Sequence, residues 1–198
     1  VAVLILAAAL ALLRREPSSC APHKSWDLCR LEEAIAAGDG AACDGIGNDT
    51  LRDSCMAEVG KATGDTALCE RIKGPTTRDA CRGPIAMAAN QSEACATLST
   101  PFWRDLCHVH FADAQSDFTW CHNASNPVVE ENCLYDFGRA RNDIDSCDAI
   151  DNRSRRDNCL YFVGIKGHHE LACSQIIERG VANACRINLA VALNSSEG

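Results

Sequence analysis

The spacing of the cysteines constrains the fold of this chain more than any other feature of its sequence. From Cys29 onward, the intervals between successive cysteines alternate between 14 and 12 residues without exception. The chain therefore contains a repeat of 26 residues, a period typical of solenoid proteins. Six full repeats begin at Cys43, Cys69, Cys95, Cys121, Cys147 and Cys173, and an altered repeat that holds Cys20 and Cys29 precedes them.

When the first cysteine of each repeat is numbered 1, the other positions follow the period of an α-helix. Positions 13, 17 and 20 share one helical face, and position 18 is always Ala or Gly, which would let a neighbouring helix approach closely. Asp39, Asp65, Asp117 and Asp143, at position 23, are placed to cap a second helix that runs through the next cysteine and position 4. Each repeat is therefore predicted to be a hairpin of about 7–9 and about 12–14 helical residues. Such hairpins bury their apolar faces only by stacking, so we expect an all-α fold, a right-handed-type α-solenoid with one disulfide per hairpin.

Position 11 is acidic in all repeats but the last. It would lie in the first turn of the long helix, where a carboxylate can cap the backbone. A ladder of calcium ligands is the alternative for this position. The residues are Asp27, Asp53, Asp79, Asp105, Glu131, Asp157 and Asn183.

Other residues mark the course of the long helices. Thr50, Thr76 and Ser154 stand three residues before position 11, as in a capping box. Gly83-Pro84 falls inside one long helix, where we expect a kink or a broken turn. An arginine at position 10 is predicted to form salt bridges between stacked repeats; it is present as Arg52, Arg78, Arg104 and Arg156.

Two disulfide pairing schemes fit a hairpin, one across the 12-residue interval and one across the 14-residue interval. The second scheme leaves Cys20 and Cys185 at opposite ends of the solenoid, whereas the first uses all fourteen cysteines. The first scheme is therefore favoured. It joins Cys20 to Cys29, Cys43 to Cys55, Cys69 to Cys81, Cys95 to Cys107, Cys121 to Cys133, Cys147 to Cys159 and Cys173 to Cys185.

Fourteen cysteines in 198 residues indicate an oxidising compartment, because thiols at this density persist as disulfides only outside a reducing cytoplasm or in some hyperthermophiles. We therefore expect an extracellular or cell-surface location. Zinc is the weaker alternative, since the chain has no C-x-x-C motif. The net charge of −8 argues against nucleic acid as a partner.

Residues 1–13 form an uncharged apolar run that ends at Arg14, Arg15 and Glu16. As a helix, thirteen residues span about 20 Å, which is too short for the roughly 30 Å of a bilayer core. The chain does not start with Met, so it is processed or its beginning is missing. We predict two parts, a hydrophobic N-terminal helix over residues 1–16 and a disulfide-stapled repeat domain over residues 17–198.

Residues 1–16 resemble the amino-terminal part of a type IV pilin, especially an archaeal one. In that family the hydrophobic helix packs in the filament core, which implies that this segment buries itself against another subunit; membrane contact through residues 1–13 is the alternative. The residues concerned are Val1, Val3, Leu4, Ile5, Leu6 and Leu10. The repeat pattern C-x2-I-x5-R-D-x-C, seen from Cys69 to Cys81, resembles cysteine-rich helical-hairpin repeats of secreted archaeal proteins, which are TPR-like in architecture.

The last repeat ends without a visible polar capping element. Val191, Ala192 and Leu193 precede a short polar stretch, residues 194–198, where the next short helix would begin. An apolar arm at one end and an uncovered repeat face at the other predict head-to-tail contact between copies, which builds open filaments. Truncation of the sequence at both ends is the alternative.

Five N-x-S/T sequons occur where about one is expected by chance. They predict a glycan-coated surface, because four of the five fall at positions 6 or 22, the two expected turns of the hairpin. The fifth, at position 3, is expected near the end of a short helix. The asparagines are Asn48, Asn90, Asn123, Asn152 and Asn194.

Catalysis has no residues to support it in this sequence. No phosphate-binding loop or nucleophile elbow is present, and the six histidines, which include His108, His110 and His122, are predicted to be surface residues. We therefore expect no enzyme activity, no cofactor and no metal. The sequence predicts a structural subunit of an extracellular, glycosylated, pilus-like filament that polymerises with itself. The alternative is a membrane-anchored cell-surface repeat protein that binds a protein, peptide or glycan.

Overall fold

The computed structural model describes Cys20 and residues 26–196, where every regular element is a helix. The chain divides into two compact units, Val1–Ile85 and Ala86–Gly198. The boundary falls inside one helix, α5 (Pro75–Ala88), which is continuous through Pro84. The broken turn predicted there is therefore wrong, because a single proline removes only one backbone hydrogen bond of the helix.

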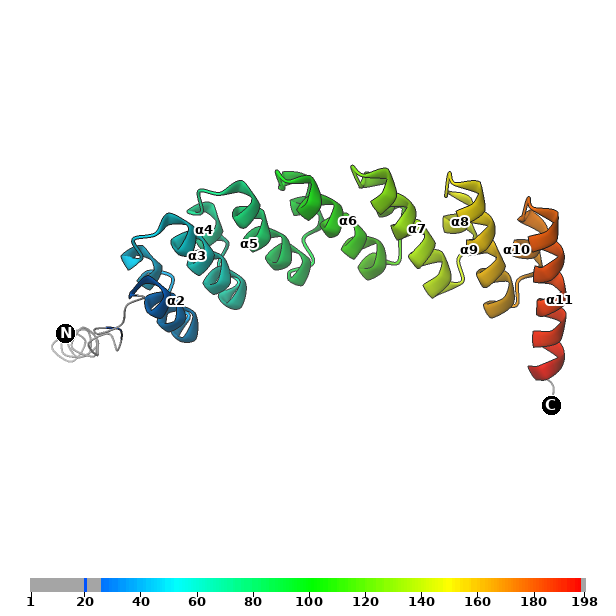
Figure 1. The fold of residues 1–198 in the computed structure, drawn as a ribbon, viewed down its shortest axis with the longest axis horizontal. Coiled ribbons are helices and arrows are strands. Elements are labelled where there is room, and N and C mark those ends of the chain that lie inside the picture. The colour runs from blue at the N-terminus through cyan, green and yellow to red at the C-terminus, as the bar shows by residue number, and fades with distance from the viewer. Residues whose placement is uncertain (1–19, 21–25, 197–198) are drawn as a thin grey trace, which may run out of the picture. The chain divides into compact units, whose positions relative to one another are not determined.

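Within each unit, short and long helical elements alternate along the chain (Figure 1). The predicted fold class is confirmed: the described chain consists of helical repeats with one disulfide each. The first unit contains α2 (Trp26–Ala37), η1 (Ala42–Gly45), α3 (Asp49–Thr63), α4 (Thr66–Glu70) and most of α5. The second contains η2 (Ser92–Thr97), α6 (Pro101–Gln115), η3 (Phe118–Asn123), α7 (Pro127–Arg141), α8 (Ile144–Asp148), α9 (Arg153–Lys166), α10 (Glu170–Gln175) and α11 (Arg179–Ser196).

The short elements are shorter than predicted. They span four to six residues, and η1, η2 and η3 are 3₁₀-helices. Their starts agree with the sequence, since the side chain of Asp65 accepts from the Ala67 N–H at 2.9 Å and that of Asp143 from the Ser146 N–H at 2.7 Å. The prediction that they run through position 4 is wrong, because Ile46 has an extended backbone and buries its side chain.

Three of the long helices, α3, α7 and α9, begin with an asparagine cap in place of the predicted capping box. Asn48 accepts a hydrogen bond from the Leu51 N–H at 3.0 Å, and Asn152 accepts one from the Arg155 N–H at the same distance. Thr50, Thr76 and Ser154 lie inside the first turn of their helices instead. Position 6 takes the capping role because these helices begin at position 7, which places the predicted cap at position 8 inside the helix.

The carboxylate at position 11 binds the following repeat. In the second unit, Asp157 accepts hydrogen bonds from the N–H groups of Ile177 and Glu178 at 3.1 and 2.9 Å. The donors lie 20 and 21 residues further along the chain, in the turn that leads into the next long helix. We call this arrangement the aspartate clasp. The prediction that position 11 caps its own helix is wrong, because its two oxygens satisfy the next repeat's turn.

The aspartate clasp recurs through both units. Asp53 accepts from Lys73 and Gly74, and Asp105 accepts from Ser125 and Asn126 at 2.7 and 3.2 Å. Buried carboxylates are tolerated only when they are hydrogen-bonded, and backbone N–H groups serve here without any cation. Further clasps are Asp27 to Gly47 and Asn48, and Glu131 to Asn152.

The arginines at position 10 do not form the predicted salt bridges between repeats in the two cases where their contacts are seen. Arg78 donates from Nε and Nη2 to the Ile72 carbonyl of its own repeat at 2.9 and 2.7 Å, and Arg52 donates to the Ile46 carbonyl at 3.4 Å. The guanidinium reaches this carbonyl because the short helix ends there. Other residues pair between repeats, among them Lys73 with Asp49 at 3.1 Å.

The seven disulfides join cysteines across the 12-residue interval, with Cys20 bonded to Cys29. Six of them link the short and the long helix of one repeat, and Cys20 is joined to α2 through Cys29. Thirteen of the fourteen cysteines are buried. Closing a loop of this length stabilises a fold by about 2–3 kcal/mol through restriction of the unfolded chain. The disulfides therefore hold together hairpins that are too small to have a core of their own.

The small residue at position 18 makes room for the disulfide of the next repeat. A Cβ atom on Gly164 would lie 2.8 and 2.9 Å from the sulfurs of Cys173 and Cys185, closer than such atoms pack. Gly138 has the same relation to Cys147 and Cys159. The sequence predicted that a neighbouring helix approaches this position closely. The atoms that come closest to Gly138 and Gly164 include the disulfide sulfurs of the next repeat.

We predict that Asp157→Asn lowers the free energy of unfolding by about 1–3 kcal/mol, because the amide offers one acceptor where two N–H groups need partners. Hydrogen exchange should become faster at the amides of Ile177 and Glu178, which are the two clasp donors. The exposed Asp151→Asn is the matched control and should leave both quantities unchanged. Unchanged exchange at the two clasp amides in Asp157→Asn would contradict the role of the clasp.

Candidate functional site

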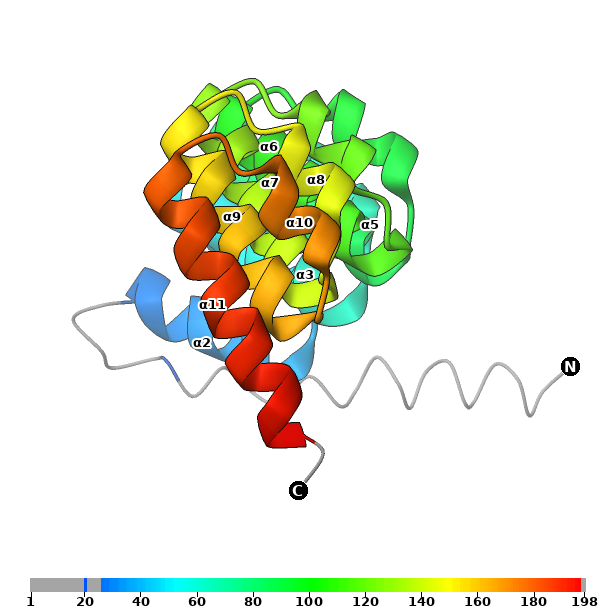
Figure 2. The same ribbon diagram turned by 90° about the vertical axis from the view of Figure 1, so that its right-hand side faces the viewer.

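The most distinctive surface of the second unit is the outer face of α11. Figure 2 shows this helix nearest the viewer, with α9 behind it. Ile187, at position 15, is 64 % exposed, whereas Tyr161 and Tyr135 at the same position are half-buried. Ala190, at position 18, is exposed, although Ala112 and the other residues at this position are buried. On α11, therefore, no residue that the structure describes covers the face that joins one repeat to the next in the inner repeats.

The chemistry of this α11 face differs from that of the inner repeats. Asn183 replaces the acidic residue of position 11, so α11 has no carboxylate that would need the donors of a following repeat. Val191 and Leu193 are exposed on the same helix. We refer to Asn183, Ile187, Ala190 and Val191 as the end face. These four residues combine apolar side chains with one neutral amide, and the exposed Arg186 beside them, at position 14, adds one cation. Such a mixture is found on surfaces that another protein element can cover.

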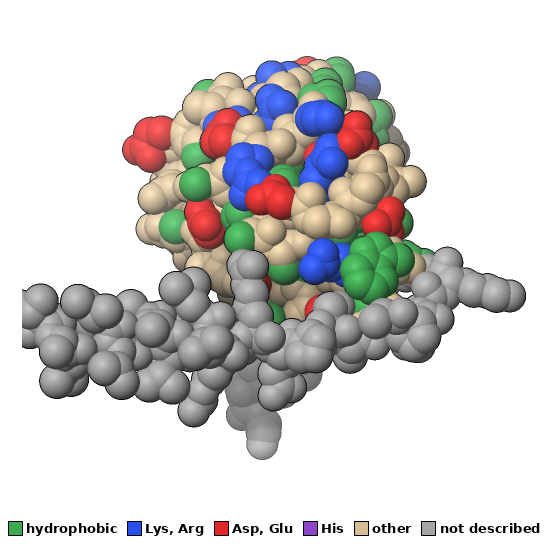
Figure 3. Space-filling model, turned by 90° about the vertical axis from the view of Figure 1, so that its left-hand side faces the viewer, with side chains coloured by type: hydrophobic (Ala, Val, Ile, Leu, Met, Phe, Trp, Pro, Cys, Tyr) green, Lys and Arg blue, Asp and Glu red, His purple; other side chains and the backbone are tan. Residues whose placement is uncertain are grey.

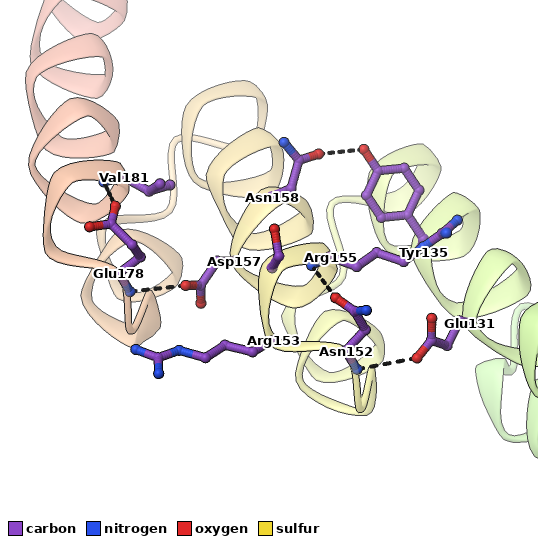
Figure 4. A pocket seen from close by; sticks show the side chains of 10 residues that line it. Glu131, Tyr135, Asn152, Arg153, Arg155, Asp157, Asn158, Glu178 and Val181 are labelled. Carbon is purple, nitrogen blue, oxygen red and sulfur yellow. Dashed lines mark hydrogen bonds between the residues drawn. The ribbon is translucent and has the colours of Figure 1, made fainter.

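A polar pocket of about 950 Å³ lies between α7, α9 and α11 (Figure 4). Tyr135 donates from its hydroxyl to Asn158 Oδ1 at 2.6 Å, and the Arg155 guanidinium lies over the Tyr135 ring at 5.0 Å from its centre. Glu131 and Asp157, which also line it, are occupied by their clasps. The pocket thus follows from the contacts between repeats, and its polar groups largely satisfy one another.

An apolar groove of about 580 Å³ lies between α6 and α7. Phe102, which is 68 % exposed, Leu106 and Val109 line it from α6, and Val129 and Phe137 line it from α7. Exposed aromatic and aliphatic side chains that gather in a concave site are typical of binding surfaces for apolar partners. We call this feature the α6–α7 groove.

The α6–α7 groove has an acidic end. Asp113 and Asp136 line it near the C-terminal ends of the two helices, and both are exposed. Arg141 donates to Asp113 Oδ1 at 2.8 Å, so one cation is already present there. The sequence did not reveal the groove, because the groove residues occupy several different positions of the repeat. Which of these positions face one another in neighbouring repeats could not be read from the sequence.

All five sequon asparagines are exposed. Asn48 and Asn152 cap their helices through the side-chain oxygen, which leaves the nitrogen that would carry a sugar uncommitted by that bond. Asn90 lies in a turn with φ of +54°. Asn123 ends η3, as expected of a short helix. Asn194 lies within α11, so its predicted place in a turn is wrong, because the last long helix runs further than the others.

His108 is buried, with 7 % of its surface exposed, so the prediction that every histidine lies on the surface is wrong. Its ring stacks on Trp120 with centroids 5.8 Å apart. Burial lowers the pKa of His108 below its usual value, while the neighbouring Asp105 carboxylate acts against that change and Arg104 adds to it. Position 14 holds buried apolar residues, among them Met56 and Leu134, in three other repeats but arginine in three, so the column gave no clear signal of burial.

The described residues hold no free cysteine. Their one group of possible metal ligands is Cys20, Cys29 and Glu33. The two cysteines are joined in a disulfide, and a disulfide is not the thiolate that binds metal. His122 pairs with Glu130, their Nδ1 and Oε1 atoms being 2.7 Å apart.

Several predicted features lie outside the described residues. They include the N-terminal helix over residues 1–16 and all the assembly residues, Val1, Val3, Leu4, Ile5, Leu6 and Leu10.

Among the helices of residues 26–196, none is both long enough and apolar enough to cross a bilayer. On the face seen in Figure 3, lysine and arginine side chains lie among aspartate and glutamate side chains.

Comparison with protein-family models, curated proteins and solved structures found no match to this chain. The functional argument therefore rests on the surfaces described above.

We predict that the stability of the second unit falls as the pH drops from about 7 through 6. The folded-state pKa of His108 is lowered, so the unfolded chain takes up a proton first as the pH falls below 6.5, and this favours unfolding. His108→Gln should flatten the dependence of the melting temperature on pH in this window. The control is His110→Gln, an exposed histidine of the same helix, which should keep the wild-type profile. Equal profiles for both variants would contradict the prediction.

Proposed function

We propose that this protein is a structural subunit of an extracellular, glycosylated filament and that it has no enzymatic activity. The observation that carries the proposal is the apolar exposure on the end face of α11, where Ile187 is 64 % and Val191 62 % exposed. A surface shaped to pack against a repeat is best covered by another repeat, and a second copy supplies one. Such heterologous contact between copies extends into a filament when its rotation does not close.

The composition of the end face supports a contact of useful strength. Burial of side chains such as Ile187 and Val191 contributes about 1.5–3 kcal/mol each. Trp26 and Leu28 are exposed on α2, in the first described repeat, and offer apolar partners on the second copy. Asn183 brings no charge into such a contact, whereas an aspartate would have to find new donors.

The disulfides and sequons support an extracellular location. Seven disulfides among the described residues indicate an oxidising environment. The exposed sequon asparagines are open to modification, and sugars on them would shield a filament from proteases. The resemblance of residues 1–16 to a type IV pilin, and with it an archaeal source, belongs to this proposal.

The second candidate is a membrane-anchored surface protein that binds a foreign peptide or protein. The α6–α7 groove favours it, since an exposed apolar groove suits an apolar segment of a partner. Images of native surface material distinguish the two: fibres support the filament, and isolated particles support the receptor.

We predict that the oxidised full chain forms filaments and that Ile187→Lys shortens or abolishes them, because a lysine places a charge in the end-face contact. The measurement is negative-stain microscopy together with the sedimentable fraction. Val128→Lys is the control, because Val128 is 63 % exposed on another long helix and does not belong to the end face. Wild-type protein that stays monomeric would overturn the proposed function, and equal assembly of both variants would exclude the end face.

We also predict that native protein is heavier than its sequence mass by several sugar units, located at Asn48, Asn90, Asn152 or Asn194. Peptide mass spectrometry of native material measures this. Unmodified asparagine at all these sites would remove the glycan from the proposal and leave the assembly intact.

A further inference from the structure

The α6–α7 groove is lined by residues of two successive repeats and is apolar along most of its length. Phe102, Leu106 and Val109 face Val129 and Phe137 across it. On α6 the lining residues run from Pro101 to Asp113, a length of about 18 Å at the rise of an α-helix. An occupant of this groove must therefore be apolar and, if helical, a little more than three turns long.

The charge of the groove is confined to its far end. Asp113 and Asp136 are exposed there, while Asp105, which also lines the groove, is buried and engaged by the backbone of residues 125 and 126. Only the two exposed carboxylates are thus available to a ligand, and Arg141 already contacts Asp113. An occupant should be uncharged along the groove and basic where it leaves it.

One segment of this chain fits both requirements. Residues 1–13 are uncharged and apolar, and Arg14 and Arg15 follow them directly. Thirteen helical residues span about 20 Å, which matches the groove. With residues 1–13 parallel to α6, the two arginines come to the end of the groove that carries Asp113 and Asp136.

We propose that the α6–α7 groove binds residues 1–13 of a second copy of this chain, with Arg14 and Arg15 paired to its acidic end. The inference rests on the proposed self-assembly, which supplies the second copy. It gives the filament an arm-in-groove contact in addition to the end face. Apolar burial provides the affinity, and the arginine–carboxylate pairing fixes the direction of the arm.

The first test replaces Phe102 by the photo-crosslinking residue p-benzoylphenylalanine in the full chain. Equal amounts of isotope-labelled and unlabelled protein are assembled, irradiated and digested. Crosslinked peptides should join position 102 to residues 1–13, and half of them should carry one label and one unlabelled part. Crosslinks within single copies only, crosslinks to other segments, or assembled filaments without any crosslink to residues 1–13 would each overturn the proposal.

The second test is a charge exchange. Asp136→Arg should weaken assembly at least about tenfold through repulsion of Arg14 and Arg15. Arg14→Asp with Arg15→Asp should do the same, and the two changes combined should restore assembly. Absence of rescue, with all variants folded by circular dichroism, would overturn the pairing.

The third test compares two neighbouring residues of α7. Val129 lines the groove, whereas Val128 is exposed outside it. Val129→Lys should reduce assembly at least about tenfold, and Val128→Lys should not. Filaments that form equally in both variants would overturn this inference and leave the proposed function standing, whereas monomeric wild-type protein would overturn both. A complex of wild-type monomer with foreign apolar peptide in the groove would favour the receptor instead.

Discussion

Within each unit, the carboxylate at position 11 ties one repeat to the next, and much of the architecture follows from this contact. Asp157 and Asp105 are buried, and each accepts hydrogen bonds from two backbone N–H groups of the following turn. Such a turn has donors that no helix satisfies, since it lies between a short helical element and the first turn of a long one. The carboxylate supplies both acceptors from a neighbouring repeat. It thereby links the backbone geometry of one hairpin to the position of the one before it, which propagates the same stacking along each unit.

The disulfide and the small residue at position 18 act together with this clasp. A hairpin with a short element of four to six residues has almost no interior, so the disulfide replaces a core. Its sulfurs then become the surface that the preceding repeat packs against, as the approach of Cys173 and Cys185 to Gly164 shows. A larger side chain at position 18 would displace that disulfide. The same bond therefore closes one hairpin and provides the packing surface for its neighbour, which explains why cysteine and small residues recur with one period.

The sequence predicted the features that a regular column of residues carries, and missed those that depend on partners in other repeats. The helical repeats and the caps at Asp65 and Asp143 could be predicted because the signals are local. The partner of Asp157 could not, because an aspartate in the first turn of a helix has the same local pattern whether it caps its own helix or reaches 20 residues ahead. The α6–α7 groove was missed for the same reason, since it depends on the spacing between two helices. His108 is a different case: its column holds three apolar residues and three arginines in the other repeats, so comparison of the repeats alone does not place it in the core.

Departures from the repeat are informative because each position has a known environment in the other copies. Three departures coincide on the end face of α11. Asn183 stands where the other repeats have an acidic residue, Ile187 is exposed where Tyr161 is half-buried, and Ala190 is exposed where the equivalent residues are buried. A further difference adds a charge: Arg186 is exposed at position 14, where Leu134 and Leu160 are buried. The face has therefore lost the carboxylate of position 11 and gained a cation beside its apolar residues. The apolar part of this surface, Ile187 and Val191, is exposed next to the cation, and interfaces between protein elements combine the same two kinds of side chain.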